Sequence, residues 1–185
     1  MLPGAKDFSR MLDLGGGHGV FSLYAAELLP SLKVQVFDSP AVLKVAQQYI
    51  EEYSLQDRVS ILSGNYLSDT LDDGYDLILA SCTLNLTLAE RTTGHVVRKI
   101  YNALKPGGYF VSLHDSWPDF SEANPLFPVE YPVYSLLSGA PVNMPRGFIA
   151  SLALECGFQT VQSKELCLNA GILALDVARK ASSLT

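Results

Sequence analysis

The sequence predicts an α/β fold built on a mostly parallel, doubly wound sheet. Short segments rich in β-branched residues alternate with longer amphipathic segments, and glycine, proline, asparagine and aspartate separate them. The chain has 185 residues, of which 48% are apolar and 17% charged, so it is long enough to bury a sizeable core. We expect one domain spanning residues 1–185.

Each element has its own signal. Apolar, strand-sized runs predict strands at residues 10–14, 33–38, 59–63, 76–81 and 109–115. Helical periodicity predicts helices at residues 20–29, 41–53 and 88–104. The first helix carries an apolar stripe of Val20, Phe21, Tyr24, Ala25 and Leu28. Proline and glycine at residues 106–108 stop the third helix and turn the chain into the next strand.

After Asp115 the regular alternation of strand and helix patterns stops. Six of the ten prolines lie within residues 116–147, which also carry the aromatic residues Trp117, Phe127 and Tyr131. A long irregular insertion of this kind either forms part of a ligand pocket or covers a small core of its own. Residues 148–156 then predict a helix, and residues 160–168 and 172–179 predict a closing hairpin.

Composition excludes several classes of protein. The formal net charge is −6 and no stretch gathers basic residues, so we expect no nucleic-acid partner. No apolar run approaches the roughly 20 residues of a membrane span, and the N-terminus lacks the regions of a signal peptide. The three cysteines are odd in number and have no C-x-x-C spacing, so we expect free thiols, no metal site and a cytoplasmic protein.

A glycine-rich turn joins the first strand to the first helix. Residues 13–19 read DLGGGHG, and glycine lets a ligand lie against the backbone at a helix N-terminus. A dinucleotide fingerprint would require glycine where Val20 stands, and a tight turn without a ligand is the simpler alternative. Asp38 ends the second strand 21 residues beyond Gly17, where a carboxylate can accept hydrogen bonds from ribose, although it can also cap the next helix. Together the two features favour a nucleoside-containing cofactor.

The motifs in order resemble a known family. Residues 13–19 (DLGGGHG), 37–40 (FDSP), 63–66 (SGNY) and 103–108 (ALKPGG) are similar to those of S-adenosylmethionine-dependent small-molecule O-methyltransferases, the group of the hydroxyindole and caffeic acid enzymes. The resemblance covers residues 10–180 and implies a Rossmann-like, seven-stranded sheet whose last strand is antiparallel. It also implies S-adenosylmethionine as cofactor.

The resemblance implies a role for each matched residue. The glycines lie along the methionine part of the cofactor, Asp38 with Ser39 lies at the ribose, Asn65 and Tyr66 at the adenine, and Ser81 at the sulfonium. Asparagine replaces the aspartate that is usual at the adenine, and its side-chain oxygen still accepts a hydrogen bond. The implied cofactor-binding residues are Gly15, Gly17, Asp38, Ser39, Asn65, Tyr66 and Ser81. Cys82 either faces the sulfonium or packs at the strand end.

The catalytic base of the plant-type members is a histidine, and Asn85 stands at its place here. An amide cannot serve as a general base. His114, at the end of the fifth strand, either substitutes as base or is a hydrogen-bonded strand-end histidine. Alternatively the acceptor needs no base and Asn85 aligns it, or the domain binds cofactor without methylating. The candidate catalytic residues are therefore His114 and Asn85.

Two further interpretations complete the sequence-based account. Tyr101 and Lys105 match the Y-x-x-x-K spacing of short-chain dehydrogenases, but they precede the fifth strand instead of following it, so we treat the match as coincidence. The family's dimerising N-terminal region has no counterpart before the first strand, so a homodimer is doubtful and apolar surface is expected to be exposed. The predicted function is methyl transfer from S-adenosylmethionine to a small, aromatic acceptor; the alternative is a non-catalytic cofactor-binding or protein-interaction domain.

Overall fold

The computed structural model describes residues 2–84, 90–115, 145–168 and 171–182. Within them, one seven-stranded sheet has the order β3-β2-β1-β4-β5-β7-β6. Its strands are β1 (Arg10–Leu14), β2 (Lys33–Asp38), β3 (Val59–Ser63), β4 (Tyr75–Ser81), β5 (Leu104–Asp115), β6 (Thr160–Leu168) and β7 (Gly171–Arg179). Only β7 runs antiparallel to its neighbours β5 and β6, while all other pairs are parallel. The predicted fold class and its antiparallel last strand are confirmed.

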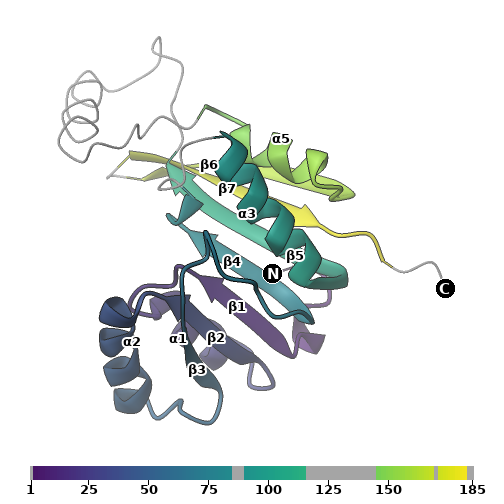
Figure 1. Cartoon of the computed structure of the whole chain (residues 1–185). Coiled ribbons are helices and arrows are strands. Elements are labelled where there is room, and N and C mark those ends of the chain that lie inside the picture. The colour runs from purple at the N-terminus through teal and green to yellow at the C-terminus, as the bar shows by residue number, and fades with distance from the viewer. Residues whose placement is uncertain (1, 85–89, 116–144, 169–170, 183–185) are drawn as a thin grey trace.

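Helices cover both faces of the sheet, as Figure 1 shows. They are α1 (Val20–Leu28), α2 (Pro40–Glu52), α3 (Glu90–Ala103) and α5 (Phe148–Glu155), preceded by the short 3-10 helix η1 (Ala5–Asp7). The helices α1 and α2 contact β2 and β3, whereas α3 and α5 contact β5 and the final hairpin. This doubly wound arrangement brings the carboxyl ends of β1, β2, β3 and β4 to one edge, where ligands bind in open α/β sheets.

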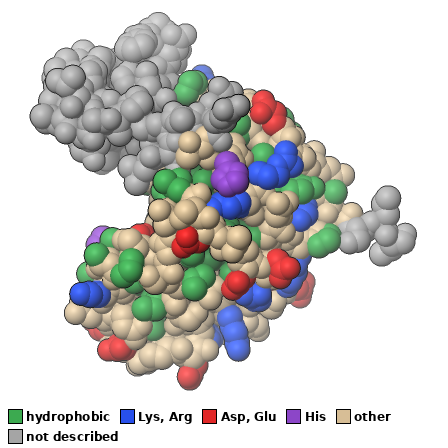
Figure 2. All heavy atoms as spheres, in the orientation of Figure 1, with side chains coloured by type: hydrophobic (Ala, Val, Ile, Leu, Met, Phe, Trp, Pro, Cys, Tyr) green, Lys and Arg blue, Asp and Glu red, His purple; other side chains and the backbone are tan. Residues whose placement is uncertain are grey.

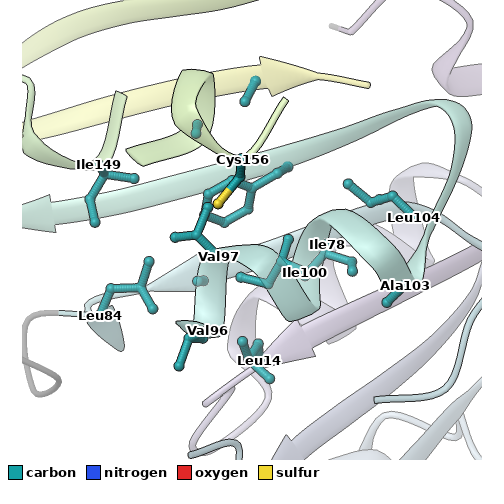
Figure 3. Close-up of a cluster of buried hydrophobic side chains, with 14 of the residues drawn as sticks. Leu14, Ile78, Leu84, Val96, Val97, Ile100, Ala103, Leu104, Ile149 and Cys156 are labelled. Carbon is teal, nitrogen blue, oxygen red and sulfur yellow. The ribbon is translucent and has the colours of Figure 1, made fainter. Parts of the chain in front are cut away.

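The core follows the alternation of side chains along each strand. Leu12, Leu14, Ile78 and Phe110 point to the α3 and α5 face and join one buried cluster. Figure 3 shows Val97 of α3 close to Cys156, and Val96 on the other side of the helix, near Leu14. Ile100 of α3 and Ile149 of α5 belong to the same cluster. Met11, Val34 and Val36 point the other way, into a second cluster with Leu23, Leu43 and Ala46.

The strand β5 begins earlier than the sequence predicted. Leu104 already pairs with Tyr75, and the register then shifts so that Leu77 pairs with Tyr109. The proline and glycines at residues 106–108 therefore form an irregularity inside the strand and not a turn before it. Gly107 has a φ of +80°, and a Cβ at Gly108 would lie 2.9 Å from the carbonyl oxygen of Lys105, so both glycines are needed for this bend.

The apolar stripe predicted on the first helix is exposed and not buried. Val20, Phe21, Tyr24 and Leu28 retain 60%, 48%, 65% and 54% of their surface, while α1 packs inward through Ser22, Leu23 and Ala26. The stripe flanks a hollow over the sheet, lined by Met11, Phe21, Tyr24, Ala25, Leu28, Leu29, Leu77, Leu79 and Val111. Apolar periodicity predicted the helix correctly. The apolar stripe, however, lies beside the hollow over the sheet and is not the face with which α1 packs on it.

Four further predictions concern the insertion, the surface charge, membrane-spanning helices and metal sites. The insertion was predicted at residues 116–147, and residues 116–144 of it lie outside the described residues, as does Asn85. On the face in Figure 2, basic and acidic side chains are interspersed and neither sign forms a large continuous patch. Among the described residues, no helix is long and apolar enough to cross a membrane, and no group of three or more His, Cys, Asp or Glu residues is placed to hold a metal ion.

Candidate cofactor-binding site

The glycine loop between β1 and α1 adopts a backbone that only glycine takes readily. Gly15, Gly17 and Gly19 have φ values of +68°, +57° and +77°, and Gly19 is the N-cap of α1. The amides of Gly15 and Gly16 both donate to the carbonyl oxygen of Phe37, at 2.7 and 3.2 Å. The loop is therefore fixed against the end of β2.

Asp38 ties the end of β2 to the same loop. Its Oδ2 accepts a hydrogen bond from the amide of Gly17 at 2.9 Å, and its Oδ1 accepts one from the amide of Ser39 at 2.6 Å. Ser39 is the N-cap of α2, and its side chain makes no capping hydrogen bond. The spacing of 21 residues between Gly17 and Asp38 thus corresponds to a direct contact in the folded chain.

A hollow of about 310 Å³ lies over the loop. It is lined by Asp13, Gly15, Gly16, Gly17, His18, Val20, Phe21 and Ser81. A Cβ placed on Gly17 would meet nothing within 4 Å, so the space beside this glycine is open. The structure brings the predicted Gly15, Gly17 and Ser81 to one hollow and places Asp38 in contact with the loop that forms it.

Asp13 is a lining residue that the sequence analysis did not single out. It is fully buried, and Ser22 donates a hydrogen bond to its Oδ2 at 2.7 Å, while Oδ1 has no partner among the described residues. Burial raises the pKa of this carboxyl to about 6, the Ser22 hydrogen bond acts against that rise, and the charge of Asp38 adds to it. The available signal was an acidic residue inside the otherwise buried apolar strand β1.

Asn65 and Tyr66 follow β3 and differ in exposure. The Asn65 side chain is exposed, and its Oδ1 accepts a hydrogen bond from the amide of Leu67 at 3.0 Å, which forms an Asx turn. Tyr66 is half-buried against the core, and its hydroxyl donates to the carbonyl oxygen of Thr83 at 3.4 Å. Burial, and to a lesser extent the charge of Asp38, raise the pKa of Tyr66.

The chain turns sharply out of β4 at this edge. Ser81 ends the strand, and Cys82 has a φ of +53°, which is rare for a residue other than glycine. The amide of Cys82 donates to the carbonyl oxygen of Leu113 at 2.7 Å. Thr83, which is buried, donates from Oγ1 to the carbonyl oxygen of Leu14 at 2.8 Å and so reaches the start of the glycine loop.

Comparison with known families accounts for this arrangement. The model of a family described as the O-methyltransferase domain matches residues 4–126, which include the glycine loop, Asp38 and the end of β4. This chain belongs to the O-methyltransferase domain family. The match begins and ends within the chain, and it covers more than half of it.

Individual relatives are similar over unequal parts of this O-methyltransferase domain. Acetylserotonin O-methyltransferase of Macaca mulatta is 27% identical over 158 residues, which are 85% of this chain and 45% of that protein. L-tyrosine C(3)-methyltransferase of Streptomyces lavendulae is 32% identical over 100 residues, which are 54% of this chain and 27% of that protein. The crystal structure of human N-acetylserotonin methyltransferase in complex with SAM superposes with a TM-score of 0.72 at 27% identity, covering 98% of this chain and 50% of that one. The chain spans less than half of the two curated relatives.

His114 lies in β5 at the same edge of the O-methyltransferase domain, but it is enclosed. Only 1% of its surface is exposed. Its Nδ1 lies 3.1 Å from the hydroxyl of Ser112, and its Nε2 lies 3.8 Å from Oδ2 of Asp176 on β7. Both ring nitrogens therefore lie near side chains of the sheet, and the role of His114 as base stays a prediction. Asn85, the other predicted catalytic residue, is outside the described residues.

Tyr101 and Lys105 each contact other side chains of the fold. Lys105 forms an ion pair with Asp76, with 2.7 Å between Nζ and Oδ1. The Tyr101 ring packs edge-to-face on Phe158, and Lys180 lies over its face. These contacts agree with the interpretation of the Y-x-x-x-K spacing as coincidence.

Proposed function

We propose that the hollow over the glycine loop binds S-adenosylmethionine and that this domain transfers its methyl group to a small, aromatic or otherwise apolar acceptor. One observation carries the proposal. The Gly17 to Asp38 hydrogen bond holds a carboxylate, which we assign to the ribose, against the loop that forms the hollow, and the hollow is lined by Asp13, a buried acid with one oxygen that has no partner among the described residues. A ligand with both a ribose and a cationic amino acid group satisfies both acids.

The charges fit this cofactor. The methionine part carries an ammonium group, and Asp13 supplies an acceptor that has no partner of its own among the described residues. A hydrogen bond between charged groups is worth roughly 1.5–3 kcal/mol. Each Asp38 oxygen accepts one backbone hydrogen bond and keeps a further lone pair for a ribose hydroxyl. Asn65 and Tyr66 then flank the adenine, where Asn65 Oδ1 has a lone pair beyond the one that Leu67 uses.

The acceptor side rests on alignment. The cofactor supplies an electrophilic methyl group on a sulfonium, so the chain must hold the acceptor atom in line with it. We propose that Asn85 orients the acceptor by hydrogen bonding. His114 as general base stays a prediction, since its ring would have to leave Ser112 and Asp176 to reach an acceptor. A thiolate acceptor is already deprotonated and would need no base of this kind.

Titration calorimetry tests the cofactor directly. The chain is titrated with S-adenosylmethionine and S-adenosylhomocysteine, with NADH as the control ligand. Micromolar affinity for the sulfur ligands, about −8 kcal/mol, and none for NADH is the expected result. The variant Asp38→Ala is expected to lose at least tenfold in affinity because it removes the ribose acceptor, whereas Asp57→Ala changes a surface acid outside the site and leaves affinity unchanged. Absence of binding by the wild-type chain would contradict the proposal.

Turnover needs a separate measurement, because binding alone also fits a non-catalytic module. Transfer of labelled methyl from S-adenosylmethionine is followed with a panel of phenols, aromatic carbon acceptors and thiols. Product with any of them, lost in Asp38→Ala, supports an enzyme. Binding without product from any acceptor would favour the non-catalytic alternative for this chain.

Location and assembly are part of the same proposal. We infer a cytoplasmic protein with a small-molecule acceptor and without a nucleic-acid partner. If two copies associate, the exposed stripe on α1 is the surface where we expect contact, because an apolar patch of this kind commonly marks an interface. Sedimentation of wild type and Tyr24→Glu tests this: a dimer in wild type that dissociates in the variant supports it, and a dimer in both places the interface elsewhere.

A further inference from the structure

Thr83 meets the glycine loop from the side opposite β2. Its hydroxyl donates to the carbonyl oxygen of Leu14 at 2.8 Å, and the carbonyl oxygens of Ser81 and Gly15 lie at 3.2 and 3.4 Å. A hydroxyl has one hydrogen to donate, so Leu14 is its main partner. Parallel pairing of β1 with β4 stops at Asp13 and Leu79, and the Thr83 side chain therefore continues the bonding of β1 where the sheet ladder has ended.

The packing at Gly15 is equally tight. A Cβ at Gly15 would overlap Oγ1 and Cγ2 of Thr83 and would come within 3.0 Å of its Cβ. The glycine is thus required both by its positive φ and by the threonine that lies against its Cα. With Phe37 accepting from the amides of Gly15 and Gly16 on the other side, the loop is held from both neighbouring strands.

Thr83 is itself rigidly placed. It follows Cys82, whose left-handed conformation is held by the hydrogen bond to Leu113, and it precedes Leu84, which is 1% exposed in the core beside α3 (Figure 3). Its carbonyl oxygen accepts from the Tyr66 hydroxyl, and Lys99 of α3 donates to the carbonyl oxygen of Tyr66. Cys82, the residue just before Thr83, has a strained backbone, and such residues cluster at functional sites.

We propose that Thr83 is a positioning residue that sets the conformation of the glycine loop for the cofactor and links the loop to Tyr66. This inference rests on the proposed function. Thr83 does not line the hollow, so it acts through Leu14 and Gly15 and not by touching the ligand.

The test compares four variants by calorimetric titration with S-adenosylhomocysteine, at a temperature where each is fully folded. Thr83→Val keeps the shape and removes the hydroxyl, and Thr83→Ala is a smaller variant without it in case valine prevents folding. Thr83→Ser keeps the hydroxyl and removes the methyl group. Thr93→Val makes the same chemical change at a buried threonine of α3 that does not line the hollow.

We expect Thr83→Val and Thr83→Ala to bind about tenfold more weakly, Thr83→Ser to bind within threefold of wild type, and Thr93→Val to bind as wild type does, whatever its thermal midpoint. A structural role alone would lower the midpoints of both valine variants and leave both affinities unchanged, and that result would overturn the inference. If wild type itself does not bind the ligand, the proposed function fails and this inference fails with it.

Discussion

Two buried acids, Asp13 and Asp176, lie in the same sheet in contrasting surroundings. Asp13 is on β1, accepts one hydrogen bond from Ser22, and lines the hollow over the glycine loop. Asp176 is on β7, accepts from Ser163, and faces Nε2 of His114 at 3.8 Å. Each acid has one carboxylate oxygen without a hydrogen bond among the described residues, Oδ1 in Asp13 and Oδ2 in Asp176. The Asp176 oxygen, however, is the one that lies near the His114 ring.

We interpret the difference as one between an acid of the proposed cofactor site and an acid that contributes to the packing of the sheet. A buried charge without a partner costs free energy, and groups with perturbed pKa values cluster at functional sites. Asp176 on β7 and His114 on β5 face each other, and both side chains are buried in the sheet. On this account Asp13 contributes to cofactor binding and Asp176 to the stability of the sheet.

The largest expected effect is on cofactor affinity. In the proposed complex Asp13 faces the ammonium group, and Asp13→Asn removes its charge, so we expect binding of S-adenosylmethionine to weaken about 100-fold, equivalent to about 3 kcal/mol. Asp176→Asn is the matched change in the other buried acid, and its affinity should stay within twofold of wild type. Calorimetric titration at pH 7.5 measures both. Equal losses in the two variants would remove the distinction between the acids.

The second effect is on stability as a function of pH. The pKa of Asp13 is about 6 in the folded chain against an ordinary value of 3.8, so the folded state binds more protons than the unfolded state between these values. The stabilisation from protonated Asp13 is complete below pH 3.8 and is lost as pH rises through about 6. The cost above that pH is about 3 kcal/mol.

Asparagine at position 13 avoids most of this cost, although its amide hydrogens are buried without a partner. We expect Asp13→Asn without ligand to be about 1–2 kcal/mol more stable than wild type at pH 8, and no more stable at pH 4. Urea unfolding at the two pH values is the measurement. A variant less stable than wild type at pH 8 would show that the buried charge carries no such cost.

The smallest effect concerns His114. Replacing it with glutamine removes the ring that faces Ser112 and Asp176, and we expect a loss of about 1 kcal/mol in the free energy of unfolding, with cofactor affinity unchanged. If methyl transfer is established, turnover per folded molecule should fall less than tenfold. A loss of 100-fold or more with unaltered stability would instead establish His114 as the base.

Sequence reasoning predicted most of the fold because its signals are local. The bounds of β1, β2, β3 and β6 match the predicted strands, and the contact of Gly17 with Asp38 follows from two motifs at a fixed spacing. Periodicity alone could not tell which face of α1 is covered, because burial depends on neighbours that are distant in sequence. The early start of β5 was missed as well, because proline and glycine usually mark a turn, whereas here they form a bend inside the strand at Gly107 and Gly108.

The site was predicted only in part for a related reason. Glycines and Asp38 stand out in the sequence, whereas Asp13 and Thr83 acquire their roles from burial and from contacts across the sheet. Thr83 meets Leu14 at a distance of 69 residues along the chain, and no local pattern reports such a contact. His114 stands out at a strand end in the sequence, but its burial was not evident there.

Proton release on cofactor binding tests the central claim most directly. Calorimetry of S-adenosylmethionine binding at pH 6, repeated in buffers of different ionisation enthalpy, counts the protons exchanged. Because the pKa of Asp13 is about 6 and the ammonium group favours its charged form, we expect release of roughly half a proton in wild type at pH 6. Release should be absent at pH 8 and absent in Asp13→Asn at either pH. Binding by wild type at pH 6 with no proton release, or with the same release in Asp13→Asn, would contradict the assignment of Asp13 to the cofactor.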